Sequence, residues 1–173
     1  YLGICYLQIE KPDYAAAIAQ LKKAIQDPQL EVREETLINL GRALFDFASS
    51  DSVNDDQRKQ RLQEASVVFQ KFIDEFTDSN SLDQAIYYAG EAEYQLGRFD
   101  KAVSTLKRLT DAPQLQRSSL RPDGLFSLGV ALEAIEQPKQ PIEAYQAFFK
   151  SYPEHRLARE VRLRLAEQYL VQN

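Results

Sequence analysis

The sequence predicts an all-α protein, a right-handed superhelical solenoid of antiparallel helix pairs. Three observations carry this prediction: the composition, a glycine that recurs along the chain, and a second small residue that recurs with it. Of 173 residues, Ala and Leu supply 40, whereas Val, Ile and Thr supply 21. Strong helix formers therefore outnumber strand formers. With only 6 Gly and 7 Pro, the composition disfavours an all-β or a doubly wound fold.

The recurring glycine lies inside an apolar helical pattern. Gly3, Gly41, Gly90 and Gly129 each follow Leu or Ala, and Ala166 takes the same place in a fifth segment. The steps between these small residues are 38, 49, 39 and 37 residues. A glycine within a helix costs roughly 1 kcal/mol relative to alanine. Because apolar residues continue at helical spacing after each glycine, we interpret the glycines as points of close helix crossing and not as helix ends.

A second signature follows each glycine: an alanine with a large apolar residue four positions later, which is helical spacing. We expect the alanine to lie on the face of the second helix that meets the glycine. The pairs are Ala17/Leu21, Ala65/Phe69, Ala102/Leu106 and Ala144/Phe148.

Together these signatures resemble the tetratricopeptide repeat, a helix-turn-helix unit of about 34 residues. The other units have 2, 12 and 3 more residues between glycine and alanine than the best-matching third unit. The resemblance covers essentially all 173 residues and implies about four and a half repeats. The helix pairs are expected at 1–28, 31–77, 81–113 and 122–153, with a final helix at 155–171. The residues that carry the match in the third unit are Ala89, Gly90, Gly97, Arg98, Phe99, Ala102, Leu106 and Pro113.

Helix-breaking residues divide these units into individual helices. Pro28, Pro113 and Pro153 end second helices, and Pro122 fits a first helical turn. Ser81, with Gln84 three residues later, predicts a capping box at the start of the third unit. The expected helices are, in order, 1–9, 13–27, 31–48, 56–76, 81–96, 99–111, 122–136, 139–152 and 155–171.

Residues 47–61 form the one stretch of low hydrophobicity and hold most of the 12-residue insertion of the second unit. We interpret them as a polar connection that lengthens both helices of this unit. The alternative is a partner-specific loop, because long loops in compact arrays are often functional. As a polar connection offers little to a core, we expect it to be dispensable for folding.

The inventory of chemically active residues is thin. A lone Cys5 and a lone His155 exclude a Cys/His zinc site, an internal disulfide and a two-cysteine redox pair. The chain has no phosphate-binding loop, nucleophile elbow or metalloprotease motif. A net charge of −5 has the wrong sign for binding nucleic acid. We therefore predict a protein that is not an enzyme and that has no catalytic residues, cofactor, metal or nucleic-acid partner.

In the family that the sequence resembles, first helices line a concave groove. Its residues lie three before, one after and four after the small residue. Ten of the fourteen corresponding side chains are apolar or aromatic, three are acidic, and only Arg42 is basic. This composition suits an apolar peptide or helix with a basic residue, and not a C-terminal carboxylate. Alternatively, these side chains simply pack against neighbouring helices. The candidates are Ile4, Leu7, Ile38, Arg42, Phe45, Tyr87, Glu91, Tyr94, Phe126, Val130, Glu133, Leu163, Glu167 and Leu170.

The resemblance implies a scaffold for protein–protein interaction. Residues 148–158 look like units of bacterial envelope proteins of the Tol-associated periplasmic and barrel-assembly lipoprotein types, so we expect a periplasmic or envelope location. The alternative is a regulatory or substrate-docking domain of a larger enzyme or cytoplasmic complex. We expect the chain to be a fragment, because it begins inside a helical pattern without Met. No run reaches the roughly 18 apolar residues of a membrane span.

Overall fold

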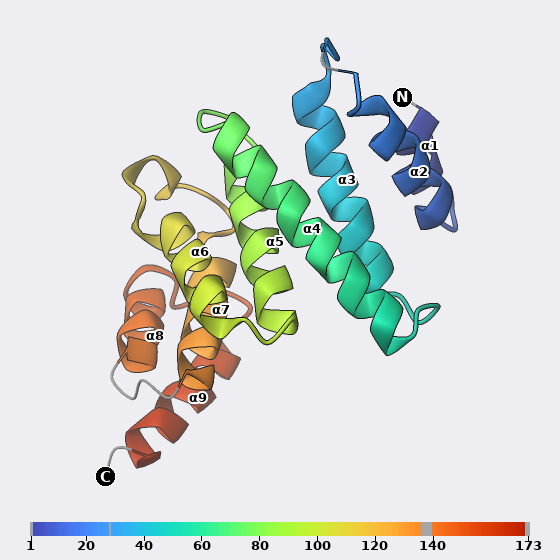
Figure 1. Cartoon of the computed structure of the whole chain (residues 1–173). Helices are drawn as coiled ribbons and strands as arrows, with labels where there is room; N and C mark the ends of the chain where they lie inside the picture. Colours follow the sequence, from blue (N-terminus) through green and yellow to red (C-terminus); the bar gives the residue numbers. More distant parts are fainter. Residues whose placement is uncertain (1, 28, 136–139, 172–173) are drawn as a thin grey trace.

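The computed structural model describes residues 2–27, 29–135 and 140–171. These residues form nine α-helices and one short 3-10 helix, and the described part of the chain contains no strand. The helix pairs follow one another in chain order, so the two termini lie at opposite ends of the array (Figure 1). The predicted all-α solenoid of antiparallel helix pairs is confirmed.

The helices lie close to the expected positions. The two largest differences are three residues each: α2 ends at Ala24 and α9 begins at Ala158. Residues 1, 28 and 136–139, which include Pro28 and the expected ends at 136 and 139, lie outside the described residues. The pairs are α1 (Leu2–Gln8) with α2 (Tyr14–Ala24), α3 (Arg33–Ala48) with α4 (Asp55–Glu75), α5 (Leu82–Gln95) with α6 (Phe99–Asp111), and α7 (Arg121–Ala134) with α8 (Gln140–Ser151); the 3-10 helix η1 (Pro113–Leu115) follows α6, and α9 (Ala158–Val171) stands last.

The expected capping box at the start of α5 is wrong. Ser81 makes no side-chain capping hydrogen bond; instead its backbone N–H donates to the hydroxyl of Ser79 at 2.9 Å. A capping box does occur at the start of α4, where Asn54 and Gln57 each accept the other's backbone N–H, at 2.9 and 3.1 Å. An asparagine can cap a helix as well as a serine does, and the sequence pattern did not include it.

The glycines allow close helix crossing, as predicted. A Cβ atom built on Gly41 would lie 2.5 Å from a ring carbon of Phe69, and one on Gly90 would lie 2.6 Å from Cγ of Leu106. Gly3 faces Leu21 in the same way, at 2.7 Å. In the fourth pair the side chain that lies on Gly129 is Tyr145, and not Phe148 of the second signature. The side chain four positions after the alanine therefore covers the glycine in three pairs of four.

The first helix of each pair lies on the inside of the array. α5 contacts both α3 and α7 directly, whereas no contact of similar extent joins α4 with α6 or α6 with α8 among the described residues. The apolar core is correspondingly a chain of three clusters that run along the array and not one centre. Tyr87 packs against both the first and the second cluster. Each unit is therefore stabilised mainly by its neighbours, which is typical of a solenoid.

Successive units are also joined by a polar contact that recurs in register. The hydroxyl of Ser79 donates to Glu34 at 2.5 Å, and the hydroxyl of Ser118 donates to Asp83 at 2.6 Å. Both serines stand eleven residues before a recurring glycine, and both acids stand seven before one. His155 takes the serine position before Ala166, and its Nε2 lies 3.9 Å from a carboxylate oxygen of Asp123.

Most of the insertion in the second unit is helical. α3 continues to Ala48 and α4 begins at Asp55, which agrees with the interpretation that the insertion lengthens both helices. The short connection is nevertheless anchored. Val53 is buried, with 9% of its surface exposed, and Arg58 Nε donates to the carbonyl of Ala48 at 3.1 Å. The expectation that residues 47–61 offer little to the core is therefore wrong for Val53.

Candidate functional site

The register of the first helices decides which side chains share a surface. α3, α5, α7 and α9 each begin eight residues before their small residue. Positions at the same offset from that residue therefore lie at the same level on successive helices, so the candidates do form rows across the array. The structure then divides them by exposure, from two buried side chains on α3 to three exposed side chains on α9.

On α3, two of the three candidates belong to the core. Ile38 and Phe45 are buried, and Phe45 meets the ring of Tyr88 edge-on at 5.2 Å between ring centroids. Here the alternative interpretation, packing between helices, is correct. Arg42 remains accessible; its guanidinium lies over the Tyr88 ring at 4.5 Å and 3.7 Å from a carboxylate oxygen of Asp46.

On α5, all three candidates are half-buried. Tyr87 packs edge-on against Tyr88 at 5.2 Å, and Tyr94 packs against Phe99 at 5.4 Å. Burial raises the pKa of Tyr87, and the nearby charges of Glu91 and Asp123 raise it further. Tyr87 therefore stays neutral near pH 7. The rings of both tyrosines are held by neighbouring rings.

The carboxyl group of Glu91 lies between α5 and α7. Burial raises its pKa, hydrogen bonding to the hydroxyl of Ser127 lowers it, and the charge of Asp123 raises it again. The net direction is upward. The hydroxyl of Ser127 also lowers the pKa of Tyr87, so one hydroxyl of α7 acts on two candidate side chains of α5. Glu91, Tyr87 and Ser127 therefore form a small polar group on an otherwise aromatic surface.

On α7, Phe126 and Val130 are half-buried and Glu133 is already engaged. Glu133 accepts the hydroxyl of Tyr145 at 2.7 Å and pairs with Arg164 Nη1 at 2.8 Å. The guanidinium of Arg164 also lies 5.6 Å from the centre of the Phe126 ring. Glu133 is therefore tied to α8 and α9, and Phe126 to α9.

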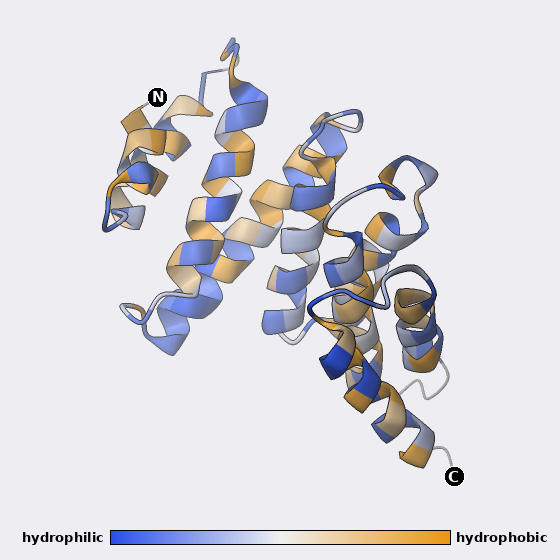
Figure 2. Cartoon of the chain, turned by 180° about the vertical axis from the view of Figure 1, so that it is seen from behind, coloured by the Kyte–Doolittle hydropathy of each residue, from blue (hydrophilic) through white to orange (hydrophobic). Residues whose placement is uncertain are grey.

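At the two ends of the array the candidates do not continue the same surface. Leu163 and Leu170 on α9 are 56% and 77% exposed, and Glu167 is exposed as well. Figure 2 shows strongly hydrophilic and hydrophobic residues alternating along α9. At the other end, Ile4 and Leu7 are half-buried on the short α1. We use the name inner face for the seven half-buried candidates in the middle: Arg42, Tyr87, Glu91, Tyr94, Phe126, Val130 and Glu133.

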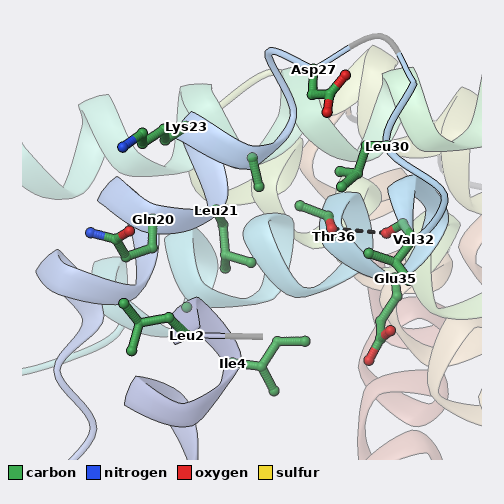
Figure 3. A pocket seen from close by; sticks show the side chains of 12 residues that line it. Leu2, Ile4, Gln20, Leu21, Lys23, Asp27, Leu30, Val32, Glu35 and Thr36 are labelled. Carbon is green, nitrogen blue, oxygen red and sulfur yellow. Dashed lines mark hydrogen bonds between the residues drawn. The ribbon is translucent and has the colours of Figure 1, made fainter.

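Several cavities among the described residues lie outside the inner face, including one beside α1 and one between α4 and α6. One of about 360 Å³ opens between α1, α2 and the start of α3, over Ile4, Leu21 and Leu30 (Figure 3). The dashed line in Figure 3 marks the hydrogen bond from the Thr36 hydroxyl to the carbonyl of Val32, at 2.8 Å. Of the fourteen candidates, only Ile4 lines it.

The second cavity, of about 670 Å³, lies between α4 and α6 with α5 as its floor. The floor contains the buried carboxylate of Glu93, 7% exposed, which accepts the hydroxyl of Ser66 at 2.5 Å and lies 3.4 Å from Arg98 Nη1. Glu93 is therefore a satisfied structural group between two units.

The described residues around the lone histidine do not form a catalytic group. His155 faces Asp123 and packs edge-on against Phe148 at 5.7 Å, and the described residues around it include no nucleophile in hydrogen-bond contact. Within the described residues, no three His, Cys, Asp or Glu side chains gather where a metal ion could bind. In the same residues, no helix combines the length and apolarity that crossing a membrane requires.

Sequence reasoning missed Tyr88, whose ring packs against two side chains of the inner face, Arg42 and Tyr87. Its ring contacts Arg42, Phe45, Tyr87 and also Phe69, with which it stacks at 5.8 Å. Tyr88 lies two residues before Gly90, at an offset that the concave-groove pattern does not include. Two consecutive tyrosines were the available signal, since one of them must face the neighbouring helices when the other faces outward.

One part of the chain matches a known family in sequence. Residues 84–114, which include most of α5 and all of α6, match the sequence model of the tetratricopeptide repeat. A search of curated proteins finds no match.

Solved structures share the fold over nearly the whole chain. The crystal structure of MamA is 23% identical with a TM-score of 0.69, over 92% of this chain and 79% of that one. A putative kinesin light chain from Podosopora anserina with nearly identical TPR-like repeats is 18% identical with a TM-score of 0.68, over 99% of this chain and 83% of that one. At these identities the likeness concerns the fold alone.

Proposed function

We propose that this chain is a non-enzymatic scaffold that binds a segment of another protein on its inner face. The repeat match at 84–114 and the solenoid fold of the similar structures support an interaction role. The observation that carries the proposal is the partial burial of the candidate side chains on α5. Its candidates Tyr87, Glu91 and Tyr94 are all half-buried, so each is held by packing while part of its surface remains accessible.

The chemistry of this surface favours a mainly apolar segment with some basic character. Tyrosine suits binding hot spots because it combines a large apolar area and a polar tip with modest rotamer entropy. The rings of Tyr87 and Tyr94 are already fixed by Tyr88 and Phe99, so ordering them on binding costs little. An amphipathic helix or an extended peptide can use such a surface.

The proposed setting is bacterial cell-envelope assembly, in the periplasm. Its support is the likeness of residues 148–158 to units of bacterial envelope proteins. The second candidate function is a regulatory or substrate-docking domain of a larger enzyme or cytoplasmic complex. The TPR-like repeats of a putative kinesin light chain, whose fold this chain shares, favour keeping this alternative.

A peptide selection tests the proposal. A phage-displayed peptide library is selected on the immobilised chain, and the tightest peptides are synthesised and measured by isothermal titration calorimetry. Tyr87→Ala combined with Tyr94→Ala should weaken binding by roughly 2 kcal/mol or more, as truncation of hot-spot residues does. Circular dichroism should show nearly unchanged helicity.

Tyr169→Ala is the matched control, because Tyr169 lies on α9 away from the inner face and is 43% exposed. It should leave the affinity unchanged. Peptides that bind the double variant as tightly as the unaltered chain would move the site away from the inner face.

A further inference from the structure

We infer that the inner face between α5 and α7 takes a lysine or arginine side chain of the bound segment, with the carboxylate of Glu91 as its counter-ion. The inference rests on the proposed function, since it names what one part of the same face recognises. It is carried by the distribution of charged partners on this face and by the groups that surround Glu91.

The carboxylates of α7 that lie nearest already have arginine partners. Asp123 is buried and pairs with Arg156, and Glu133 pairs with Arg164 at 2.8 Å. Both arginines come from the last unit, so this chain itself supplies cations to carboxylates along α7. Glu91 on α5 differs from these two carboxylates. None of the ion pairs between described residues includes Glu91.

Arg42, the one basic residue of the inner face, also has partners within the chain. Arg42 lies over the ring of Tyr88 at 4.5 Å and near Asp46 at 3.7 Å. Its guanidinium is therefore held between Tyr88 on α5 and Asp46 on α3, and it is not the partner of Glu91. A cation for Glu91 must come from outside the described residues.

The surroundings of Glu91 suit an ammonium or guanidinium group. Tyr87 stands one helical turn before it and Tyr94 nearly one turn after it, so all three share one side of α5. A cation gains charge-assisted hydrogen bonds from a carboxylate and further attraction from aromatic rings. Burial raises the pKa of Glu91, and Asp123 raises it further, so a bound cation relieves both effects.

Other occupants fit less well. An acidic segment would meet Glu91 and Asp123 with the same sign of charge. A wholly apolar segment would cover the Glu91 carboxylate without supplying a cation, which carries a large desolvation cost. A C-terminal carboxylate would need free cations, and Arg42 is already engaged with Tyr88 and Asp46. A segment with one basic residue among apolar ones satisfies the rings and the carboxylate together.

The test is a coupling measurement with the selected peptides. Each Lys or Arg of the tightest peptide is replaced by norleucine, which keeps the aliphatic stem and removes the charge. On the unaltered chain the replacement at one position should weaken binding roughly tenfold, the size expected for a charge-assisted hydrogen bond. On Glu91→Gln the same replacement should change the Kd by no more than about twofold, because the counter-ion is gone.

A charge reversal and a control complete the design. Glu91→Lys should bind a peptide with glutamate at that position better than the original peptide, which a merely structural role of Glu91 would not produce. Glu167→Gln removes an exposed carboxylate from α9 and should leave the norleucine effect at its full size. Circular dichroism checks that each variant is folded.

The outcomes separate the two proposals. An equal norleucine effect on the unaltered chain and on Glu91→Gln, or tight peptides that contain no basic residue, would overturn this inference and leave the proposed function intact. If no selected peptide depends on Tyr87 and Tyr94, the proposed function fails and this inference fails with it.

Discussion

The hydroxyl oxygen of Ser118 lies 2.6 Å from a carboxylate oxygen of Asp83, and one unit earlier Ser79 makes the same contact with Glu34 at 2.5 Å. Each serine also accepts a backbone N–H two residues later, from Leu120 at 3.0 Å and from Ser81 at 2.9 Å. One hydroxyl therefore shapes the turn before a first helix and joins that helix to the preceding unit.

Removing one of these hydroxyls should lower stability. We expect Ser118→Ala to reduce the free energy of unfolding by about 1 kcal/mol, the usual net value of a hydrogen bond of this kind. Urea unfolding followed by circular dichroism measures the change. Ser119→Ala removes an exposed neighbouring hydroxyl and should have no effect. Equal stability of the two variants would show that the contact to Asp83 contributes nothing.

Filling a close helix crossing should be costly. Gly90→Leu places a large side chain where Cγ of Leu106 lies 2.6 Å from the position of a Cβ atom, and overpacking of this kind costs about 1 to 3 kcal/mol or more. Thermal unfolding should show a lower Tm. Ala147→Leu on the exposed side of α8 is the control for added volume. An unchanged Tm for Gly90→Leu would contradict the role of glycine in close crossing.

The connection between α3 and α4 should contribute to stability through one residue. Val53 is 9% exposed, so Val53→Ala removes buried apolar surface and should cost about 1 kcal/mol or more. Ser52→Ala, at the exposed neighbouring position, should cost almost nothing. The comparison is made by urea unfolding. If both variants match the unaltered chain, the connection is dispensable after all.

Glu91 should make stability depend on pH. Its pKa is raised in the folded chain, so the folded state holds the proton more tightly than the unfolded state. The unaltered chain therefore loses stability as pH rises from the unfolded-state pKa, about 4.3, through the higher folded-state pKa. Glu91→Gln removes this loss, so it should be more stable than the unaltered chain at pH 7.

The same variant provides its own check at low pH. Below about pH 4 both states of Glu91 are protonated, so the advantage of Glu91→Gln should disappear. Urea unfolding at several pH values measures the difference, with Glu167→Gln as the exposed control. A difference that is independent of pH would mean that the carboxyl group does not titrate as described.

The sequence predicted the helices and their pairing because both depend on local residue types. Small residues at helical spacing, such as Gly41 and Gly90, mark crossings wherever the chain carries them. The predicted groove was less reliable. Offsets from the glycine indicate which side of a helix a residue is on, but Ile38 and Phe45 are buried because Tyr88 and other neighbours cover them. Whether a side chain is buried depends on residues of the next unit, and a pattern within one helix does not describe them.

The contacts between units were beyond sequence reasoning for the same reason. Ser118 and Asp83 are 35 residues apart, and neither residue type is unusual at a helix start. Only the repetition of the spacing, with Ser79 and Glu34, marks the contact as part of the architecture. In the fourth pair Tyr145 and not Phe148 lies on Gly129, and the hydroxyl of Tyr145 donates to Glu133.

The attachment of α9 differs in kind from the attachment of the earlier first helices. α5 and α7 are joined to the preceding unit through serine hydroxyls, whereas α9 and the turn before it rely on Arg156 with Asp123 and Arg164 with Glu133. Ion pairs that remain partly open to solvent weaken as dissolved salt screens them. Higher ionic strength should therefore loosen the polar part of the docking of the last helix, which leaves the apolar contacts of Ala158 and Val161. In concentrated salt the array would fray from its C-terminal end while the interior units keep their order.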